Sequence, residues 1–582
     1  MLKKLFASVR EYRKDALLSP FFVTAEVLLE VTVPMIMADL IDRGVETGNI
    51  DYIISRGTLL IVLAMCSLLF GILAAGSAAT ASAGFAKNLR TDLFYNIQRF
   101  SFANIDRLSA SSLITRLTTD VTNIQQAFMM FIRMGARSPA MFIFAMMMAF
   151  RINSRLALVY LGVVPFLAAG LAWIMFRSYP VFERVFRTYD SLNLVVQENL
   201  RGIRVVKSFV REEHETEKFQ SISDALFRNF VKAERYMAGT MPLMQASTYA
   251  CMLLISWLGA NMIIAGDMTK GQLMSMITYT MQILMSLMML SMVLVMVSIS
   301  RAAAVRIVEV LDEVPTIAAP GSPVHNVEDG SIQFQNVLFS YAGDAAAPCL
   351  WDINLSISSG ETIGIIGGTG SGKTSLVQLI PRLYDTTMGA VLVGGTDVRE
   401  YDLTALRDSV AIVLQRNTLF TGTVSENLRW GNENATQHEL EHACALAQAD
   451  GFIKRFEHGY NARIEQGGTN VSGGQRQRLC LARALLKKPR ILILDDATSA
   501  VDTATEAAIH GALRSEMPET TKIIIAQRIS SVRDADRIIV LDNGRITGIG
   551  SHDELLQTNK IYREVYESQT RGGDFDVADD PK

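Results

Sequence analysis

This 582-residue sequence has little charge and few cysteines. Charged residues make up 19 % of it, against roughly 25 % in soluble domains. The 55 basic residues nearly balance 58 acidic ones, and the net charge of −3 excludes a globally basic nucleic-acid binder. The five cysteines show no CxxC spacing, which excludes a disulfide framework and a zinc site. We therefore expect isolated, buried thiols and no nucleic-acid partner.

Long apolar runs in the first half account for the low charge. In residues 237–300 only Asp267 and Lys270 are charged, which suits two membrane crossings of about 20 residues each with a turn between them. Four further spans are predicted at residues 20–41, 59–83, 139–150 and 156–176. The first half is therefore predicted to be a helical domain that crosses the lipid bilayer six times.

Basic residues and connection lengths set the predicted orientation. The first 15 residues are basic and amphipathic, typical of a helix on the membrane surface, and no small-residue cleavage site follows them. The long polar segments 84–130 and 177–236 are predicted to be helices that continue into the cytoplasm, because their basic residues fit the positive-inside rule. We expect a cell-membrane protein with both termini in the cytoplasm.

The second half has a different character. Residues 314–327 contain three prolines and a glycine, which is typical of a linker, and short β-rich runs then alternate with helical ones. That alternation indicates an α/β nucleotide-binding domain. We expect a membrane domain over residues 1–310, a linker over 311–330, the α/β domain over 331–570 and a flexible acidic tail over 571–582.

A glycine-rich segment of this second half matches the P-loop pattern G-x-x-x-x-G-K-[ST]. It lies between an apolar run and a helical pattern, the strand–loop–helix context that the motif requires. Backbone N–H groups would surround the phosphates of ATP, Lys373 would reach the β- and γ-phosphates, and Thr374 would hold Mg²⁺. The predicted phosphate site comprises Gly367, Gly368, Thr369, Gly370, Ser371, Gly372, Lys373, Thr374 and Ser375.

Two more segments complete the nucleotide site. The apolar run 491–495 ends in Asp495, a position suited to a second residue on the Mg²⁺ side. Between it and the P-loop lies a run that resembles the signature motif of ATP-binding cassette (ABC) proteins, with Val in place of the usual Leu. Its residues are Val471, Ser472, Gly473, Gly474 and Gln475.

The remaining motifs of that family follow in order. The resemblance implies that Tyr341 stacks on adenine, that Gln415 is the Q-loop glutamine beside Mg²⁺, and that Ser499, Ala500 and Asp502 form the D-loop. The order of membrane domain and cassette is similar to that of ABC exporter half-transporters. This implies a dimer with two ATPs sandwiched between cassettes, alternating access, and intracellular coupling regions at residues 102–121 and 198–209.

Two positions depart from what a self-sufficient ATPase of this family requires. The family places Glu after the strand-end Asp as general base, and here Asp496 sets the carboxylate roughly 1 Å or more back, a displacement that can cost about 100-fold in rate. The family places His in its switch loop, and here Gln527 can bond the γ-phosphate but cannot carry a proton at neutral pH. The site is predicted to bind ATP and hydrolyse it slowly, the alternative being that both residues are tolerated.

This pattern resembles one subunit of the bacterial heterodimeric ABC exporters with asymmetric sites. In that family each signature completes the other subunit's ATP site, so this chain would offer a nearly intact signature and an impaired site of its own. A homodimer would contain two impaired sites. We therefore expect a second, non-identical half-transporter that has the catalytic Glu and the switch His.

The substrate pathway is marked by carboxylates and methionines. Glu26 and Glu30 share one face of the first span. They indicate recognition of cationic apolar compounds, a structural pair with Arg133 or Arg137, or a span that ends nearer the membrane surface. Methionines on the sixth span suit a promiscuous apolar cavity, or packing and lipid contact. The cavity candidates are Glu26, Glu30, Arg133, Met281, Met285, Met288 and Met292.

Export of small apolar or amphipathic compounds, such as drugs, is the leading functional prediction. A flippase for lipids or lipid-linked precursors fits the same residues. A regulator that binds ATP without transport is disfavoured, because the coupling regions and the signature are nearly intact.

Overall fold

The structure is a computed structural model that describes residues 2–344 and 347–571. The tail predicted over 571–582 lies outside the described residues from position 572 onward. The chain forms two compact units. The membrane unit comprises Met1–Gln98 and Ala110–Glu313, and the cassette comprises Arg99–Ser109 and Val314–Lys582.

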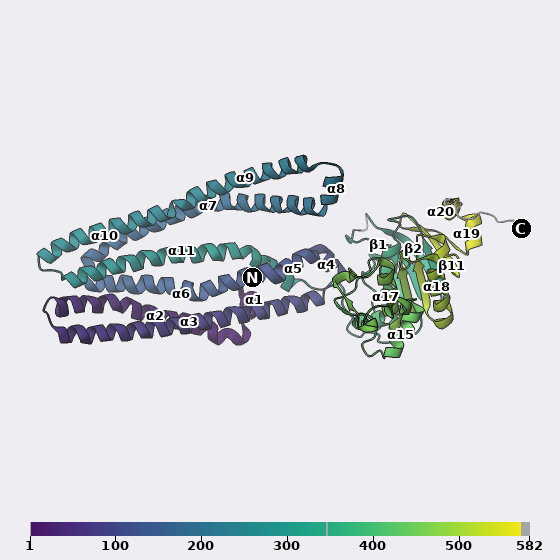
Figure 1. Cartoon of the computed structure of the whole chain (residues 1–582), viewed down its shortest axis with the longest axis horizontal. Helices are drawn as coiled ribbons and strands as arrows, with labels where there is room; N and C mark the ends of the chain where they lie inside the picture. Colours follow the sequence, from purple (N-terminus) through teal and green to yellow (C-terminus); the bar gives the residue numbers. More distant parts are fainter. Residues whose placement is uncertain (1, 345–346, 572–582) are drawn as a thin grey trace. The chain divides into compact units, whose positions relative to one another are not determined.

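Long helices build the membrane unit (Figure 1). Helix α2 lies along α3, α6 lies along α11, and α7 lies along α9. Apolar side chains such as Val27, Tyr160 and Tyr279 pack between α2, α6, α7, α10 and α11. The helices are α1 (Leu2–Ala7), α2 (Arg13–Leu40), α3 (Ile50–Gln98), α5 (Ala110–Thr115), α6 (Val121–Ile152), α7 (Ser154–Arg201), α8 (Ile203–Ser208), α9 (Glu212–Ala238), α10 (Thr240–Ile264) and α11 (Lys270–Asp312).

Five helical stretches of the described residues are long and apolar enough to cross a membrane, one fewer than predicted. They are Arg10–Val45, Ile50–Gln98, Ser154–Arg201, Glu212–Ile264 and Lys270–Asp312. The predicted span at 139–150 lies in α6, which is long enough but contains Arg133, Arg137 and Arg151. These arginines leave α6 without a stretch as apolar and as free of charge as the best stretch of each of the other five. The fold class, a membrane domain of apolar helices plus an α/β domain, is confirmed.

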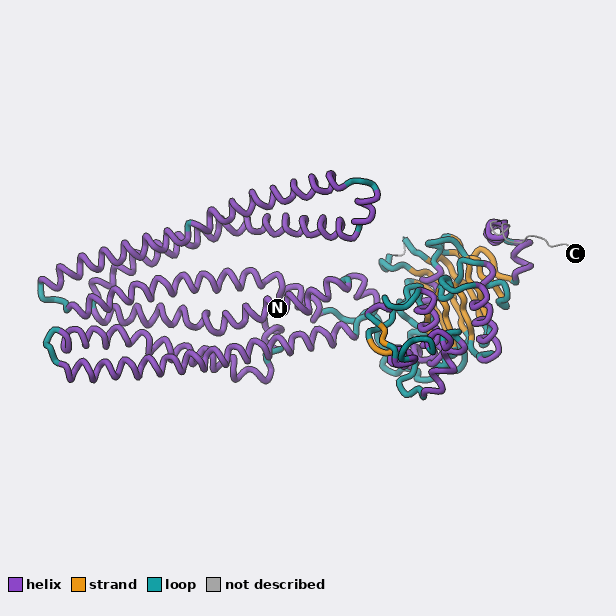
Figure 2. The backbone as a smooth tube through the Cα atoms, in the orientation of Figure 1, coloured by secondary structure: helices purple, strands orange, loops and turns teal. Residues whose placement is uncertain are grey.

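A six-stranded sheet forms the centre of the cassette (Figure 2). Its order is β12-β11-β3-β10-β9-β6, and all neighbours are parallel except β11 and β12. Apolar cores pack on both faces, which explains why β9 and β10 are buried along their whole length. The strands are β3 (Thr362–Ile366), β6 (Val410–Val413), β9 (Ile491–Asp495), β10 (Thr521–Ile525), β11 (Arg537–Asp542) and β12 (Arg545–Gly550).

The other elements of the cassette surround this sheet. An antiparallel sheet has the order β2-β1-β4-β5, and a short ribbon joins β7 and β8. These strands are β1 (Ile332–Phe339), β2 (Leu350–Ile357), β4 (Met388–Val393), β5 (Thr396–Asp397), β7 (Gly422–Thr423) and β8 (Arg463–Ile464). The α-helices are α4 (Phe102–Leu108), α12 (Lys373–Gln378), α13 (Leu403–Ser409), α14 (Val424–Arg429), α15 (Gln437–Leu446), α16 (Asp450–Ile453), α17 (Gly473–Leu486), α18 (Thr503–Glu516), α19 (His552–Thr558) and α20 (Lys560–Arg571).

Parallel strands place the functional segments at one edge. The order β3-β10-β9-β6 brings together the carboxyl ends of four adjacent strands. The P-loop follows β3, the switch loop (residues 526–528) follows β10, Asp495 ends β9, and Gln415 follows β6. Ligands of open α/β sheets bind beyond these ends.

The cysteine prediction is partly wrong. Cys251, Cys444 and Cys480 are buried and Cys349 is half-buried, but Cys66 is exposed on α3. Cys66 lies on a helix that is apolar enough to face lipid, where exposing a small apolar thiol costs little free energy.

Candidate functional site

The P-loop has the backbone that its glycines allow. Gly370 and Gly372 adopt φ values of 81° and 97°, a left-handed region that side chains strongly disfavour. The ammonium of Lys373 donates hydrogen bonds of 2.8 Å to the carbonyl oxygens of Gly367 and Gly368. Burial lowers the pKa of Lys373 and outweighs the opposite effect of the nearby Asp495 and Asp496 carboxylates.

Thr374 and Asp495 lie side by side, as a shared Mg²⁺ ion requires. The Thr374 hydroxyl donates a hydrogen bond of 2.8 Å to an Asp495 carboxylate oxygen, and burial raises the pKa of that carboxyl. Two hard oxygen donors beside a phosphate loop fit Mg²⁺, which prefers one or two carboxylates plus phosphate oxygens. In the described part of the chain, no group of three or more His, Cys, Asp or Glu side chains could hold another metal ion.

Asp496 and Gln527 contact each other beyond β9 and β10. The Gln527 amide donates a hydrogen bond of 2.9 Å to a carboxylate oxygen of Asp496, and the Gln415 amide donates a longer one of 3.5 Å to the same oxygen. Asp496 has a left-handed backbone (φ 54°), which Asp tolerates better than most residues. Its carboxylate therefore faces two amide donors, neither of which can accept a proton from water.

The signature motif begins helix α17. Ser472 caps the helix, because its hydroxyl accepts a hydrogen bond of 3.2 Å from the Gln475 backbone while the Gln475 side chain accepts one of 2.9 Å from the Ser472 backbone. Val471, the residue that departs from the family pattern, is buried in the cassette core. A Cβ atom on Gly474 would lie 2.7 Å from the Ala500 carbonyl oxygen, so only glycine fits there.

Gln477 joins the signature helix to the D-loop of the same chain. Its carbonyl accepts a hydrogen bond of 3.0 Å from the Ala500 backbone, and its amide donates one of 3.0 Å to the Ser499 hydroxyl. Asp502, the last D-loop residue, caps α18 through a bond of 2.9 Å from the Thr505 backbone. The signature, which the family pattern assigns to the partner's ATP, is thus held to the D-loop of the same chain.

Tyr341, which is predicted to stack on adenine, lies beside the P-loop helix. Its hydroxyl lies 2.9 Å from the Ser375 hydroxyl, and about half of the side chain is exposed. Its ring packs edge-on against that of Tyr384, with the centroids 5.0 Å apart. Tyr384 in turn donates a hydrogen bond of 2.6 Å to Asp106 on α4, so the first predicted coupling region contacts the nucleotide side of its cassette.

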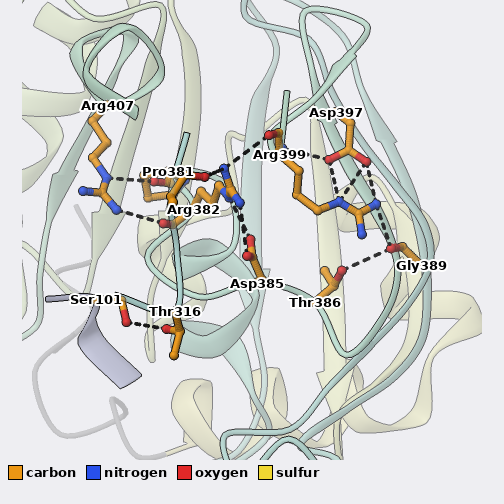
Figure 3. Close-up of polar contacts among 11 residues, drawn as sticks. Ser101, Thr316, Pro381, Arg382, Asp385, Thr386, Gly389, Asp397, Arg399 and Arg407 are labelled. Carbon is orange, nitrogen blue, oxygen red and sulfur yellow. Dashed lines mark hydrogen bonds and ion pairs between the residues drawn. The ribbon is translucent and has the colours of Figure 1, made fainter. Parts of the chain in front are cut away.

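Two arginines fix the loop that carries Tyr384 (Figure 3). Arg382 donates hydrogen bonds of 2.8 and 3.2 Å to the two carboxylate oxygens of Asp385, and Arg407 donates to the carbonyl oxygens of Pro381 and Arg382. Arg382 is itself buried, so this fork is a rigid support. The position of Tyr384 is therefore determined by its own cassette.

In the membrane unit, Glu26 and Glu30 share one cation. The guanidinium of Arg137 lies 2.7 Å from Glu26 and 2.6 Å from Glu30, which selects Arg137 over Arg133 as their partner. Two carboxylates and one guanidinium leave a net charge of −1 when all are ionised. On α11, Met281, Met285 and Met292 are exposed and Met288 is half-buried.

Sequence reasoning missed two of these residues. Gln477 lies two positions beyond the signature residues, and its place in the same polar run could have drawn attention to it. Tyr384 carries no comparable signal, because its partners Asp106 and Tyr341 are far away in the sequence.

Known proteins match both units. The family model for the ABC transporter transmembrane region matches residues 16–287, and the model for ABC transporter matches residues 350–499. An uncharacterized ABC transporter ATP-binding protein of Mycobacterium tuberculosis is 36% identical over 575 residues, and the uncharacterized ABC transporter ATP-binding protein YfiB of Bacillus subtilis is 34% identical over 568. Both alignments cover 98% of each chain.

A solved structure is similar along the whole chain. It is that of a bacterial Atm1-family ABC exporter with ATP bound, with a TM-score of 0.83 and 25% sequence identity, covering 96% of this chain and 99% of that one. The chain therefore belongs to the ABC transporter family, as an exporter-type half-transporter that joins a helical membrane domain to an ATP-hydrolysing α/β domain.

Proposed function

We propose that this chain is one subunit of a heterodimeric exporter in the cell membrane, and that its own ATP site binds Mg²⁺-ATP but hydrolyses it slowly. ATP binding at this site would hold the dimer closed, and turnover would occur mainly at the partner's site. Small apolar or amphipathic compounds are the proposed substrates, and both termini are placed in the cytoplasm.

The contact between Asp496 and Gln527 carries this proposal. A general base for the attacking water must present a free acceptor oxygen at hydrogen-bond distance from it. Here Oδ2 of the shorter carboxylate accepts hydrogen bonds from Gln527 and Gln415, which leaves Oδ1 to face water, and Gln527 has no basic nitrogen to take the proton instead. Lys373, Thr374 and Asp495 have an arrangement suited to binding Mg²⁺-ATP, so the proposal separates binding from hydrolysis.

Two features support a partner cassette. Gln477 holds the signature and D-loop together as a surface that can complete another subunit's site. Helix α8 lies in the second predicted coupling region, residues 198–209. It is followed by Phe209 and Val210, whose side chains are 73% and 80% exposed. Apolar side chains at the tip of a polar helical hairpin indicate a docking surface, and a partner cassette is the proposed occupant.

The exposed methionines of α11 and the charge of −1 at Glu26, Glu30 and Arg137 favour amphipathic or cationic substrates. A lipid flippase fits the methionines equally well. Uptake of a cationic dye into inverted vesicles separates the two, because the Glu26→Gln and Glu30→Gln variants should lose dye transport only if these carboxylates recognise cations. Unchanged dye transport would remove that part of the proposal.

ATP turnover by the full chain, purified alone, tests the slow site. Turnover is expected to be close to that of the Lys373→Ala control, which lacks the phosphate-binding ammonium. The double variant Asp496→Glu/Gln527→His should raise turnover by at least about tenfold, because it restores the length of the base and a proton-accepting ring. Rapid turnover by the unmodified chain, or no gain in the double variant, would contradict the proposal.

The partner is tested separately. A neighbouring reading frame that encodes a half-transporter with Glu after its strand-end Asp and His in its switch loop would support the heterodimer. A stable complex of two copies of this chain that transports substrate without another subunit would contradict it.

A further inference from the structure

The last helix of the cassette, α20, is anchored to the core by one face. Tyr562 is fully buried, and its hydroxyl lies 2.7 Å from Nδ1 of His552 on α19. Val565 and Tyr566 are half-buried and pack against the same core. Gln569 lies seven residues beyond Tyr562 and three beyond Tyr566, so it continues this face of the helix toward the switch loop.

Gln569 bonds the switch loop at two points. Its amide donates a hydrogen bond of 2.8 Å to the carbonyl oxygen of Gln527, and its carbonyl oxygen accepts one of 2.9 Å from the backbone N–H of Ile529. These two backbone groups lie on either side of Arg528. One side chain therefore closes a ring with the loop and fixes the backbone from which the Gln527 side chain extends.

The Gln527 side chain reaches Asp496, which stands at the general-base position of the family. Gln527 donates its 2.9 Å hydrogen bond to Asp496 from a backbone that Gln569 holds. A continuous series of hydrogen bonds thus runs from α20 through the switch loop to Asp496. A loop held by two hydrogen bonds samples fewer backbone conformations than a free one, so its side chain is presented in a narrower range of positions.

We propose that Gln569 is a positioning residue for the switch loop, and that α20 controls ATP turnover through it. The residue does not touch ATP; it sets where residue 527 meets the γ-phosphate and the residue at position 496. Any partner or modification that displaces α20 would release the loop. This inference about Gln569 extends the proposed function, and only its kinetic test rests on that function.

A purely structural role for Gln569 predicts a different outcome. If the residue served only to dock α20, its loss would lower the melting temperature of the chain and leave turnover per folded molecule unchanged. A positioning role predicts lower kcat with unchanged KM for ATP, together with faster hydrogen exchange in the switch loop. These readouts separate the two roles.

The test uses the full chain in lipid nanodiscs, with Asp496→Glu/Gln527→His as the background so that turnover is measurable. Gln569→Met has nearly the same length and removes both hydrogen bonds. Glu564→Met is the matched control on the same helix, because Glu564 is exposed and forms a surface ion pair of 3.6 Å with Lys560. Gln569→Glu keeps the acceptor for Ile529 but loses the donor to Gln527, and its effect should be intermediate.

Gln569→Met is expected to lower kcat about fivefold to tenfold, with KM for ATP within about twofold and the melting temperature close to that of Glu564→Met. Hydrogen exchange of residues 526–531 in the otherwise unmodified chain should accelerate by about tenfold. Unchanged exchange in that segment would overturn the proposal. Equal kcat for Gln569→Met and Glu564→Met in an active background would also overturn it.

Failure of the proposed function gives a different result. If the background variant gains no turnover, the account of Asp496 and Gln527 is wrong. Hydrogen exchange in the unmodified chain then decides the role of Gln569 by itself.

Discussion

The side-chain amide of Gln527 lies 2.9 Å from a carboxylate oxygen of Asp496. This hydrogen bond and a longer one from Gln415 both fall on Oδ2 of Asp496, so amide donors, and no basic group, face that oxygen. The bond from Gln527 also fixes both side chains between the switch loop and the end of β9. Under the proposed function, other residues hold the phosphates and Mg²⁺ of ATP while hydrolysis at this position is slow.

The first prediction concerns the removal of the Asp496 charge. Asp496→Asn should lower ATP turnover by the purified chain less than about threefold, because the carboxylate contributes little as a base; a working general base contributes about 100-fold or more. Lys373→Ala is the control that reports the loss of phosphate binding. A drop of about 100-fold in the Asn variant would show that Asp496 is an active base.

The second prediction concerns the contact of α4 with the cassette. Burial, together with the hydrogen bond to Asp106, raises the pKa of Tyr384. Tyr384→Phe keeps the ring packing but removes the bond, which is worth about 1.5–3 kcal/mol because its acceptor is charged. Hydrogen exchange of residues 102–108 should therefore accelerate about tenfold or more.

A matched control for this prediction exists in the same cassette. Tyr460 donates a similar hydrogen bond of 3.0 Å to Asp450, away from α4. Tyr460→Phe should leave exchange of residues 102–108 unchanged. Asp106→Asn combined with Tyr384→Phe should accelerate exchange no more than the larger single change, and an additive effect would show that the two residues act independently.

The third prediction concerns Glu506 on α18 and acid stability. Burial alone would raise the pKa of Glu506, but polar contacts with His510 at 3.8 Å, with Thr498, which donates a hydrogen bond of 2.6 Å, and with Ser531 outweigh it and lower the pKa to about 2. Glu506 thus has a lower pKa in the folded state than in the unfolded state. The stabilisation of the fold that results is fully present above the unfolded-state pKa of about 4.3 and is lost as the pH falls toward about 2.

Glu506→Gln should lower the melting temperature of the full chain at pH 7 by about 5 °C, since it weakens a buried network worth about 2 kcal/mol. The difference between the two proteins should shrink as the pH falls from about 4.5 toward 2. Glu516→Gln, an exposed change on the same helix, is the control. A difference that stays constant with pH would contradict the assignment.

The fourth prediction concerns the charges in the membrane unit. Arg137→Met leaves the carboxylates of Glu26 and Glu30 without their cation and should cost about 3–5 kcal/mol of stability. The melting temperature in detergent measures this loss. Neutralising the two carboxylates in the same variant should restore much of it, whereas Arg133→Met should have a smaller effect than Arg137→Met. No rescue would show that the cluster is not an ionic unit.

The sequence was informative where chemistry requires local patterns. The P-loop needs glycines at Gly370 and Gly372 for its left-handed backbone, and a parallel sheet requires apolar strands that end where ligands bind. Such requirements appear in consecutive residues, so Lys373, Thr374 and Asp495 could be brought together before the fold was known. The helical membrane unit followed in the same way from apolar runs.

The remaining parts of the site depend on packing between distant segments. Nothing near Gln569 indicates that it meets the switch loop, because the contact depends on how α20 lies on the core. Arg133 and Arg137 lie about one helical turn apart on α6, so the sequence does not decide which of them meets Glu26 and Glu30. The packing of α6 against α2 decides it. The same arginines explain why the composition of α6 falls short of an ordinary span.

The nucleotide that remains on this chain during turnover tests the slow site most directly. The chain is incubated with Mg²⁺ and azido-ATP that is radiolabelled on either the α- or the γ-phosphate, then cross-linked by light and separated from any partner. The account predicts nearly equal labelling by the two probes, because the bound ATP keeps its γ-phosphate. Labelling by the α-phosphate probe alone would show that the site hydrolyses ATP, and would contradict the account.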